Sequence, residues 1–479
     1  MNKIWLMVVT LALVGCGGGS SSDGGMGGGS GGGGGSAGGG TGGGAGGGGG
    51  GAGGGGGGGG GMNDGGTDGG IACSSLPNTL YLQIGDTQEP VIKSLGKALR
   101  NSTVNPMTIV YLTSGSCTNI DAFYNDTKIT TNPKYVPSAA ENPAWTDTSA
   151  SPSCTIEPGG HAIDLANSAL FVSTCDPSTP PAGVKLFRGP VQAYTLVVPE
   201  ASTQTAMTSQ EGYLVFGFGN TDQVDPWNDE NFLFIRPSSK STLLTWASLL
   251  GVPASKWKGQ RLDTSTMVLN SVAMSTSAEK TVGLLGAEIY DGQRNVVNAL
   301  AFKTWGQNYG YYPDSTPTSF DKQNVRDGHY VSWSPTVWLA HVDGSGVPTD
   351  ARVKYVIDAL LGDPAISPAP DFNPLDIVIS KGLVPDCAMK VTRDIEAGDL
   401  REYTPAADCG CYYESKVGGS SPECADGGVA DAGFGPDAGC FSSPLTHQQI
   451  INQCTHAVAV DKNPNLPLLM ADGGLPPLP

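Results

Sequence analysis

The chain has 479 residues and a formal net charge of −18, from 44 acidic and 26 basic side chains. This balance argues against a nucleic-acid partner, because affinity for nucleic acid depends on neutralising phosphates with lysine and arginine. A small anion remains compatible with it, since a local site can be positive on an acidic protein. Residues 1–70 are too glycine-rich for a packed domain, which leaves roughly 400 residues for one large two-lobed domain or two ordinary ones.

The first residues have the features of an export signal. Lys3 precedes an apolar run over residues 4–9 that is too short to span a membrane. The signal ends in Leu13-Val14-Gly15-Cys16, which resembles the lipobox of bacterial lipoproteins. That resemblance implies removal of residues 1–15 and lipidation of Cys16. The glycines after Cys16 differ from the aspartate associated with inner-membrane retention and favour the outer membrane or cell surface. The alternative is a chance cysteine beside an ordinary secretory signal.

A glycine-rich tether follows the lipidated cysteine, over residues 16–72. Its composition cannot bury enough apolar surface to offset the backbone entropy of ordering. A flexible chain of this length has an average reach on the order of 40 Å. We therefore expect the tether to hold a globular part away from a membrane.

The globular part begins near Cys73 and repeats one design, in which a strand leads through a turn of small residues into a helix. The first copy places a strand at 80–84, a turn at 85–87 and a helix at 89–100. A second copy has its strand at 107–112 and opens a helix at 120–125. Such repeats are typical of an α/β fold with a largely parallel sheet, in which ligands bind beyond the carboxyl ends of the strands.

Residues 231–250 form the element around which a site is expected. An apolar strand at 232–235 leads into Arg236, a turn containing Lys240 and an apolar helix. The helix N-terminus and these two cations would attract an anion. The alternative is ordinary capping of a surface helix by serine or threonine.

The order of these segments resembles the type II periplasmic binding proteins, and within them the phosphate-binding subunits of ABC importers. The resemblance covers roughly residues 78–365 and implies two α/β lobes joined by two crossing strands. Lobe 1 would comprise 73–197 and 325–384, lobe 2 would comprise 198–324, and a cysteine-rich, loop-rich tail would occupy 385–479. The segments that carry the resemblance are Ile84-Gly85-Asp86-Thr87, Ser114-Gly115-Ser116, Asp164 to Cys175, the crossing strand 192–199, Arg236 to Thr242 and Val282-Gly283-Leu284-Leu285-Gly286.

The resemblance implies a phosphate-like anion clamped between helix N-termini of the two lobes. Lys240 and Ser241 lie in the turn between Arg236 and Thr242 and are added to the residues that the resemblance implies. The expected ligand-binding residues are then Thr87, Ser116, Cys117, Arg236, Lys240, Ser241 and Thr242. Two departures stand out. Pro-Ser-Ser-Lys-Ser-Thr follows Arg236 where the family has Ser-Asp-Gly-Ser-Gly-Thr, and Ser168-Ala169 stands where it has a phosphate-reading Ser-Asp pair. Asp164 is the substitute carboxylate if the alignment is shifted slightly.

Eleven cysteines minus Cys16 leave ten, an even number that suits up to five disulfides in an exported chain. Six of them lie in the tail, at Cys387, Cys409, Cys411, Cys424, Cys440 and Cys454. A zinc site at Cys409, Cys411, Cys454 and His456 is the less favoured alternative. Within 305–338, an aromatic-rich run could stack on sugar rings, although structural anchoring is favoured. The one helix expected in the tail is 446–458.

We therefore expect an extracytoplasmic, lipid-anchored solute-binding protein that holds a phosphate-like anion without catalysing a reaction. Its expected partners are that anion, the bilayer through the acyl anchor and, by the same resemblance, an ABC permease. We expect no cofactor, metal or nucleic acid. The alternative is a surface-displayed structural or interaction protein that reuses the binding-protein fold without transport, which suits the long tether and the cysteine-braced tail.

Overall fold

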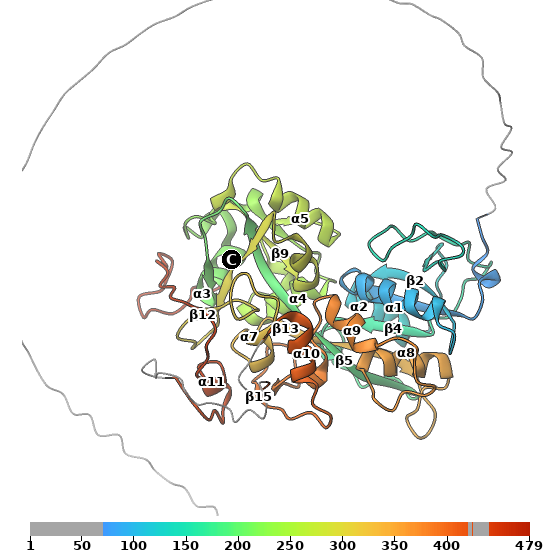
Figure 1. The fold of residues 1–479 in the computed structure, drawn as a ribbon. Helices are drawn as coiled ribbons and strands as arrows, with labels where there is room; N and C mark the ends of the chain where they lie inside the picture. Colours follow the sequence, from blue (N-terminus) through green and yellow to red (C-terminus); the bar gives the residue numbers. More distant parts are fainter. Residues whose placement is uncertain (1–69, 420–423, 425–439) are drawn as a thin grey trace, which may run out of the picture. The chain divides into compact units, whose positions relative to one another are not determined.

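The computed structural model describes residues 70–419, 424 and 440–479. The export signal, Cys16 and nearly all of the tether lie outside this part of the chain. Within it, β5 (Val184–Pro199) and β13 (Trp333–His341) run antiparallel to each other and connect the two halves of the fold (Figure 1). The two crossing strands expected from the sequence are confirmed.

One large sheet continues through both halves because β13 pairs with β4 on one side and β5 pairs with β9 on the other. Its strand order is β3-β2-β1-β4-β13-β5-β9-β7-β8, with β10 added to β5. Pairing is parallel among β1, β2 and β4 and among β7, β8 and β9. These strands are β1 (Thr79–Gly85), β2 (Thr108–Ser114), β3 (Lys134–Tyr135), β4 (Leu165–Ser168), β7 (Leu233–Ile235), β8 (Gln260–Arg261), β9 (Val282–Gly286) and β10 (Val297–Ala299).

Smaller sheets and the helices surround this sheet. The remaining strands are β6 (Ala206–Thr208), β11 (Ala301–Lys303), β12 (Gly310–Tyr311) and β16 (Ala459–Val460) in one sheet, and β14 (Val391–Thr392) with β15 (Arg401–Glu402) in another. The helices are α1 (Glu89–Asn101), α2 (Ser116–Tyr124), α3 (Ser209–Phe218), α4 (Ser241–Leu250), α5 (Ser265–Ala273), α6 (Ala287–Tyr290), α7 (Gln323–Asp327), α8 (Ala351–Leu361), α9 (Pro374–Ser380), α10 (Gly410–Val417) and α11 (His447–Ile450). None of the helices in the described ranges is long and apolar enough to span a bilayer.

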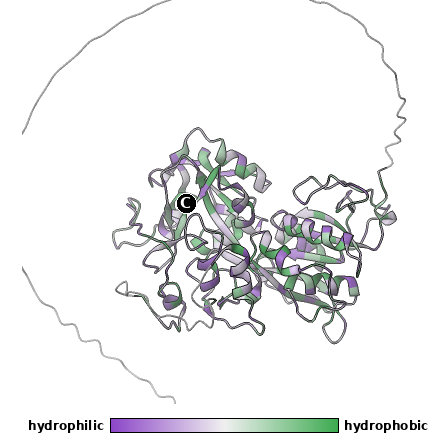
Figure 2. Cartoon of the chain, in the orientation of Figure 1, coloured by the Kyte–Doolittle hydropathy of each residue, from purple (hydrophilic) through white to green (hydrophobic). Residues whose placement is uncertain are grey.

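Apolar spacing accounts for how the helices pack. In α1, Val91, Ile92, Leu95 and Leu99 recur on one face and are buried against β1 and β2. Each such side chain stabilises the fold by about 1.5–3 kcal/mol relative to exposure. The ribbon coloured by hydropathy shows hydrophobic strands beside helices that carry both colours (Figure 2). The amphipathic helices therefore cover the sheet and leave the strand ends to carry polar loops.

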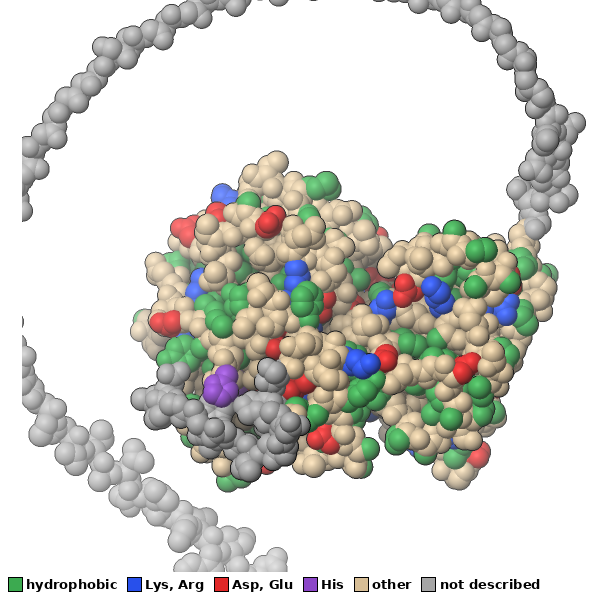
Figure 3. Space-filling model, viewed as in Figure 1, with side chains coloured by type: hydrophobic (Ala, Val, Ile, Leu, Met, Phe, Trp, Pro, Cys, Tyr) green, Lys and Arg blue, Asp and Glu red, His purple; other side chains and the backbone are tan. Residues whose placement is uncertain are grey.

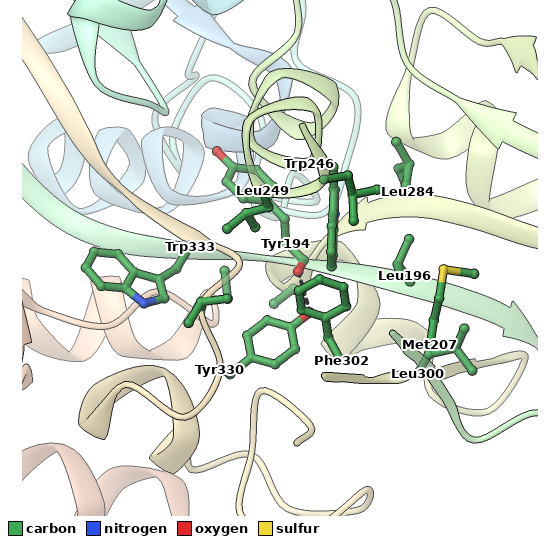
Figure 4. Packing of buried hydrophobic residues seen from close by; sticks show 14 of the residues in the cluster. Tyr194, Leu196, Met207, Trp246, Leu249, Leu284, Leu300, Phe302, Tyr330 and Trp333 are labelled. Carbon is green, nitrogen blue, oxygen red and sulfur yellow. Dashed lines mark hydrogen bonds between the residues drawn. The ribbon is translucent and has the colours of Figure 1, made fainter. Parts of the chain in front are cut away.

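The second lobe is centred on a cluster of aromatic side chains around β5 (Figure 4). Trp246 of α4 meets Phe302 of β11 edge to face, with ring centroids 4.8 Å apart. The Tyr330 hydroxyl donates a hydrogen bond to the Tyr194 carbonyl oxygen at 2.7 Å. Because Tyr330, Trp333 and Trp338 are fully buried, the structural interpretation holds for these members of the aromatic run.

The tail holds three disulfides and also contributes to the core of the second lobe. Its buried residues Met389, Leu400, Tyr413 and Ile451 pack in the same apolar cluster as β5 and α4. The expected helix at 446–458 is wrong in length, since α11 ends at Ile450. There the chain turns back and the Cys454 amide bonds the Phe441 carbonyl oxygen at 3.0 Å. The tail also contains α10, a second helix where only one is expected.

All ten cysteines of the described part form disulfides. Two lie in lobe 1, Cys73–Cys154 and Cys117–Cys175, and three lie in the tail, Cys387–Cys409, Cys411–Cys424 and Cys440–Cys454. The expectation of up to five disulfides is confirmed. The zinc alternative fails, because each cysteine that it invoked is bonded to another cysteine.

Candidate functional site

Polar loops of both lobes meet where the parallel strands end. Asp86 follows β1, Gly115 follows β2, and Arg236 follows β7. The Lys240 ammonium donates to the Ser114 carbonyl oxygen at 3.3 Å, so the loop before α4 contacts the loop before α2. The sequence placed an anion site at these strand ends, and the structure brings the loops together.

An ion-pair network crosses from one lobe to the other at this point. Arg236 Nη2 lies 2.8 Å from Asp86 Oδ2, and Lys240 Nζ lies 3.1 Å from Asp86 Oδ1. Only 1% of the Arg236 side chain is exposed, against 18% for Asp86 and 16% for Lys240. Burial would raise the pKa of Asp86, but the charges and hydrogen bonds of Arg236 and Lys240 outweigh it and lower that pKa.

Arg236 makes further bonds within lobe 2. Nη1 donates to Ser265 Oγ at 2.5 Å and Nη2 donates to the Asp263 carbonyl oxygen at 2.9 Å. Its Nε is buried and has no hydrogen-bond partner among the described residues. The guanidinium is thus held rigidly at the first turn of α5, with its charge directed at lobe 1.

The other expected residues of lobe 2 lie in the first turn of α4. Ser241 and Thr242 are buried, and Lys240 occupies the N-cap position without a side-chain capping bond. Ordinary capping by serine or threonine is therefore wrong for this helix. The first N–H groups of an α-helix have no partner within the helix, so this turn offers donors toward the network.

The expected residues of lobe 1 have mixed surroundings. Thr87 is buried directly after Asp86, and Ser116 begins α2. The Ser116 hydroxyl accepts a hydrogen bond from the Ala169 amide at 3.1 Å, which leaves its own proton to donate. Cys117 is bonded to Cys175, so its sulfur is not a free thiol. The part of Cys117 that could contact a ligand is therefore its backbone.

Asp164 lies elsewhere. Its Oδ2 accepts the Tyr81 amide at 2.8 Å, early in β1, whereas the network lies beyond the carboxyl end of that strand. The proposed substitution of Asp164 for the family's phosphate-reading carboxylate is therefore wrong. The carboxylate that reaches the network is Asp86, which is not among the residues expected to bind a ligand.

A second polar chain, also missed, runs beside Asp86. Gln88 Nε2 donates to Gln192 Oε1 at 2.5 Å, and Gln192 Nε2 donates to Glu288 Oε2 at 2.9 Å. Burial, followed by the nearby charges of Asp86 and Asp291, raises the pKa of Glu288 to about 8. Glu288 lies in the first turn of α6, two residues after the end of β9, and β9 is parallel to β7. Its position after a predicted parallel strand was therefore a signal in the sequence.

On the face drawn in Figure 3, basic and acidic side chains are interspersed. No group of three or more histidine, cysteine, aspartate or glutamate side chains suited to a metal ion occurs in the ranges that the structure describes. The positive charges that pair with Asp86 at the strand ends are those of Arg236 and Lys240.

Comparisons with known proteins return phosphate receptors among the solved structures. An ABC-type phosphate transport receptor from Vibrio cholerae is 14% identical, with a TM-score of 0.41, over 64% of this chain and 99% of that chain. A putative phosphate ABC transporter substrate-binding protein with bound phosphate from Clostridium perfringens is 13% identical, with a TM-score of 0.42, over 64% and 99%. OxyR of Corynebacterium glutamicum is 10% identical, with a TM-score of 0.34, over 65% and 70%.

No family model and no curated protein matches the chain. The phosphate receptors among these structures belong to the group of proteins that the sequence of this chain resembles in the order of its segments. At such identities and TM-scores, what this chain binds has to be inferred from its own residues.

Proposed function

We propose that the chain is an extracytoplasmic solute-binding protein that holds a small oxyanion between its lobes, without catalysis. The observation that carries this proposal is the buried Arg236 guanidinium, which lies at the strand ends and is directed at the opposite lobe. A buried guanidinium requires an anionic partner. Arg236 and Lys240 together carry two positive charges against the one negative charge of Asp86, so the network can accept a further anion.

Two helices add donors to the same site. The first turns of α2 and α4 meet across the lobes, where the ammonium of Lys240 bonds the carbonyl oxygen of Ser114. Helix N-termini favour anions through their free N–H groups and the helix dipole. Thr87, Ser116, Ser241 and Thr242 are then the hydroxyl groups that would contact the anion, with a phosphate-like oxyanion as the expected class.

The proposal extends to segments outside the described residues. Lipidation of Cys16 and a tether over 16–72 would anchor the binding protein to the outer membrane or cell surface. By the family resemblance, an ABC permease would receive the solute. Mass spectrometry of the mature N-terminus tests the anchor, and an unlipidated Cys16 would contradict it.

One observation favours a second candidate, a surface-displayed structural or interaction protein that keeps the fold without transport. Asp86 already pairs with both cations, and the lobes are in contact around it. In a structural protein whose lobes never open, Asp86 would remain paired with Arg236 and Lys240 permanently.

Calorimetric titration of the full chain with phosphate, sulfate and other oxyanions separates the two candidates. Solute binding predicts saturable binding that falls at least about tenfold in Arg236→Ala, the loss of about 1.4 kcal/mol. Arg401→Ala is the matched control, since Arg401 forms an exposed pair with Asp394. The absence of any anion binding, with no difference between Arg236→Ala and the control, would contradict the proposal and leave the second candidate.

A further inference from the structure

We propose that Asp86 is an internal ligand of the interlobe site, whose carboxylate takes the place of an external oxyanion on Arg236 and Lys240 and competes with it. This inference rests on the proposed anion site, but it makes a separate prediction about affinity. It makes Asp86 the residue that sets how strongly the site binds an anion.

Both oxygens of the Asp86 carboxylate are engaged by the opposite lobe. Oδ2 accepts from Arg236 Nη2 at 2.8 Å and from the Ser265 hydroxyl at 3.3 Å, and Oδ1 accepts from Lys240 Nζ at 3.1 Å. The Ser265 amide lies 3.4 Å from Oδ2. Two cations, a hydroxyl and a backbone amide around two oxygens are the donors that a bound oxyanion would use. Asp86 satisfies them from within the chain.

The burial of the network makes this competition strong. Arg236 is fully buried, so removal of Asp86 would leave a guanidinium charge in a low-dielectric environment without its counter-charge. Its Nε already lacks a partner within the described residues. An external anion is the least costly replacement, because it restores the neutralisation without unfolding the loop.

The position of Asp86 in the chain also makes it an efficient competitor. It follows β1 directly, and all seven residues of β1 are registered against β2, so the carboxylate is delivered from a fixed strand end. A ligand attached to its own site acts at an effective concentration in the millimolar range or above. We therefore expect Asp86 to weaken the apparent affinity for an external oxyanion by about 10- to 100-fold.

Contacts beside Asp86 link its displacement to lobe opening. The Gly115 position leaves no room for a side chain, because a Cβ there would lie 2.6 Å from the Ser239 carbonyl oxygen of the opposite lobe. The lobes therefore touch on the α2 side of the ion pair. An external anion has to displace the carboxylate and part this contact before it reaches Arg236.

The test compares the full chain with Asp86→Ala and Asp86→Asn, using inorganic phosphate in calorimetry and acetate in thermal melts. We expect phosphate to bind Asp86→Ala at least about tenfold more tightly than the unaltered chain. We also expect acetate to raise the melting temperature of Asp86→Ala saturably and that of the unaltered chain little, because acetate supplies the missing carboxylate. Asp86→Asn keeps the shape and removes the charge, so it should also bind phosphate more tightly.

The outcomes separate this inference from the proposed function. Tight binding by the variants with none by the unaltered chain would support the internal ligand and show that the native chain is not an anion receptor. Binding by the unaltered chain that is equal or weaker in the variants, with no acetate effect, would overturn the internal ligand alone. Absence of binding by all three proteins would overturn both. If Asp86→Ala does not fold, the nearly isosteric Asp86→Asn decides the question.

Discussion

Arg326 Nη1 of α7 lies 2.8 Å from Glu414 Oε1 of α10, and no more than 4% and 7% of these side chains are exposed. The same guanidinium donates through Nε to the Ala388 carbonyl oxygen at 2.9 Å and lies over the Tyr413 ring. A buried ion pair therefore joins the cysteine-rich tail to the second lobe, because α7 packs in the apolar cluster of that lobe through Val325, although 325–384 was expected in lobe 1. The tail is part of the core of that lobe as well as a disulfide-braced segment.

Glu414→Ala is expected to lower the free energy of unfolding by about 3 kcal/mol, because it leaves the Arg326 charge buried and unpaired. Urea denaturation measures the change. Lys416→Ala is the control on the same helix, since Lys416 pairs with Asp376 at an exposed position and should cost less than about 1 kcal/mol. Equal effects of the two substitutions would contradict the integration of the tail.

Gly115→Ala is expected to force the lobes apart, because the new Cβ would lie 2.6 Å from the Ser239 carbonyl oxygen. The expected cost is about 1–3 kcal/mol, as for other overpacked contacts. Small-angle scattering should show a larger radius of gyration. Gly344→Ala is the control, since a Cβ there meets nothing within 4 Å. An unchanged radius and stability would show that this interlobe contact is absent in solution.

The regular elements were predictable because burial fixes their patterns. The helix expected at 89–100 lies within α1, the strand expected at 80–84 lies within β1, and the crossing strand 192–199 lies within β5. Cys117 was assigned to the ligand from the family pattern, whereas the structure pairs it with Cys175. Disulfide pairing depends on which loops meet in space, and spacing along the chain does not specify it.

The Cys117–Cys175 disulfide should contribute stability and no ligand sulfur. It closes a separation of 58 residues, for which the chain-entropy relation gives about 4 kcal/mol. We expect the double variant Cys117→Ser with Cys175→Ser to lose stability of this order in urea denaturation. Under conditions in which this variant is folded, its phosphate affinity should be unchanged. The pair Cys440→Ser and Cys454→Ser, with a separation of 14, should lose about 3 kcal/mol. If the variant with Cys117→Ser and Cys175→Ser lost phosphate affinity and the other double variant did not, Cys117 would be a ligand-binding residue after all.

Glu288 should make stability depend on pH. Burial first, then Asp86 and Asp291, raise its pKa from 4.5 to about 8 in the folded state. The folded state thus binds more protons than the unfolded state between these values, so this contribution to stability is complete below about pH 4.5 and is lost as pH rises toward 8. We expect a loss on the order of 5 kcal/mol.

The measurement is the free energy of unfolding of the full chain and of Glu288→Gln between pH 5 and pH 9. The glutamine variant cannot ionise and should lack the decline that the unaltered chain shows. Parallel curves for the two proteins would contradict a protonated Glu288.

The pairing of Asp86 with Arg236 could not be predicted from the sequence. The position of Asp86 after a predicted strand was visible, and so was the position of Arg236 after another. Their pairing was not, because they are 150 residues apart and meet only when the two lobes are placed together. The Gln88–Gln192–Glu288 chain was missed for the same reason, since three distant segments supply its members.

We propose that an oxyanion binds between the lobes on Arg236 and Lys240. Diffraction at the arsenic absorption edge, from crystals of the unaltered full chain grown with arsenate, locates such an anion directly. This binding mode predicts an anomalous peak within hydrogen-bond distance of the Arg236 guanidinium and the Lys240 ammonium. Ordered arsenate found only at other positions, or none at saturating concentration, would contradict it.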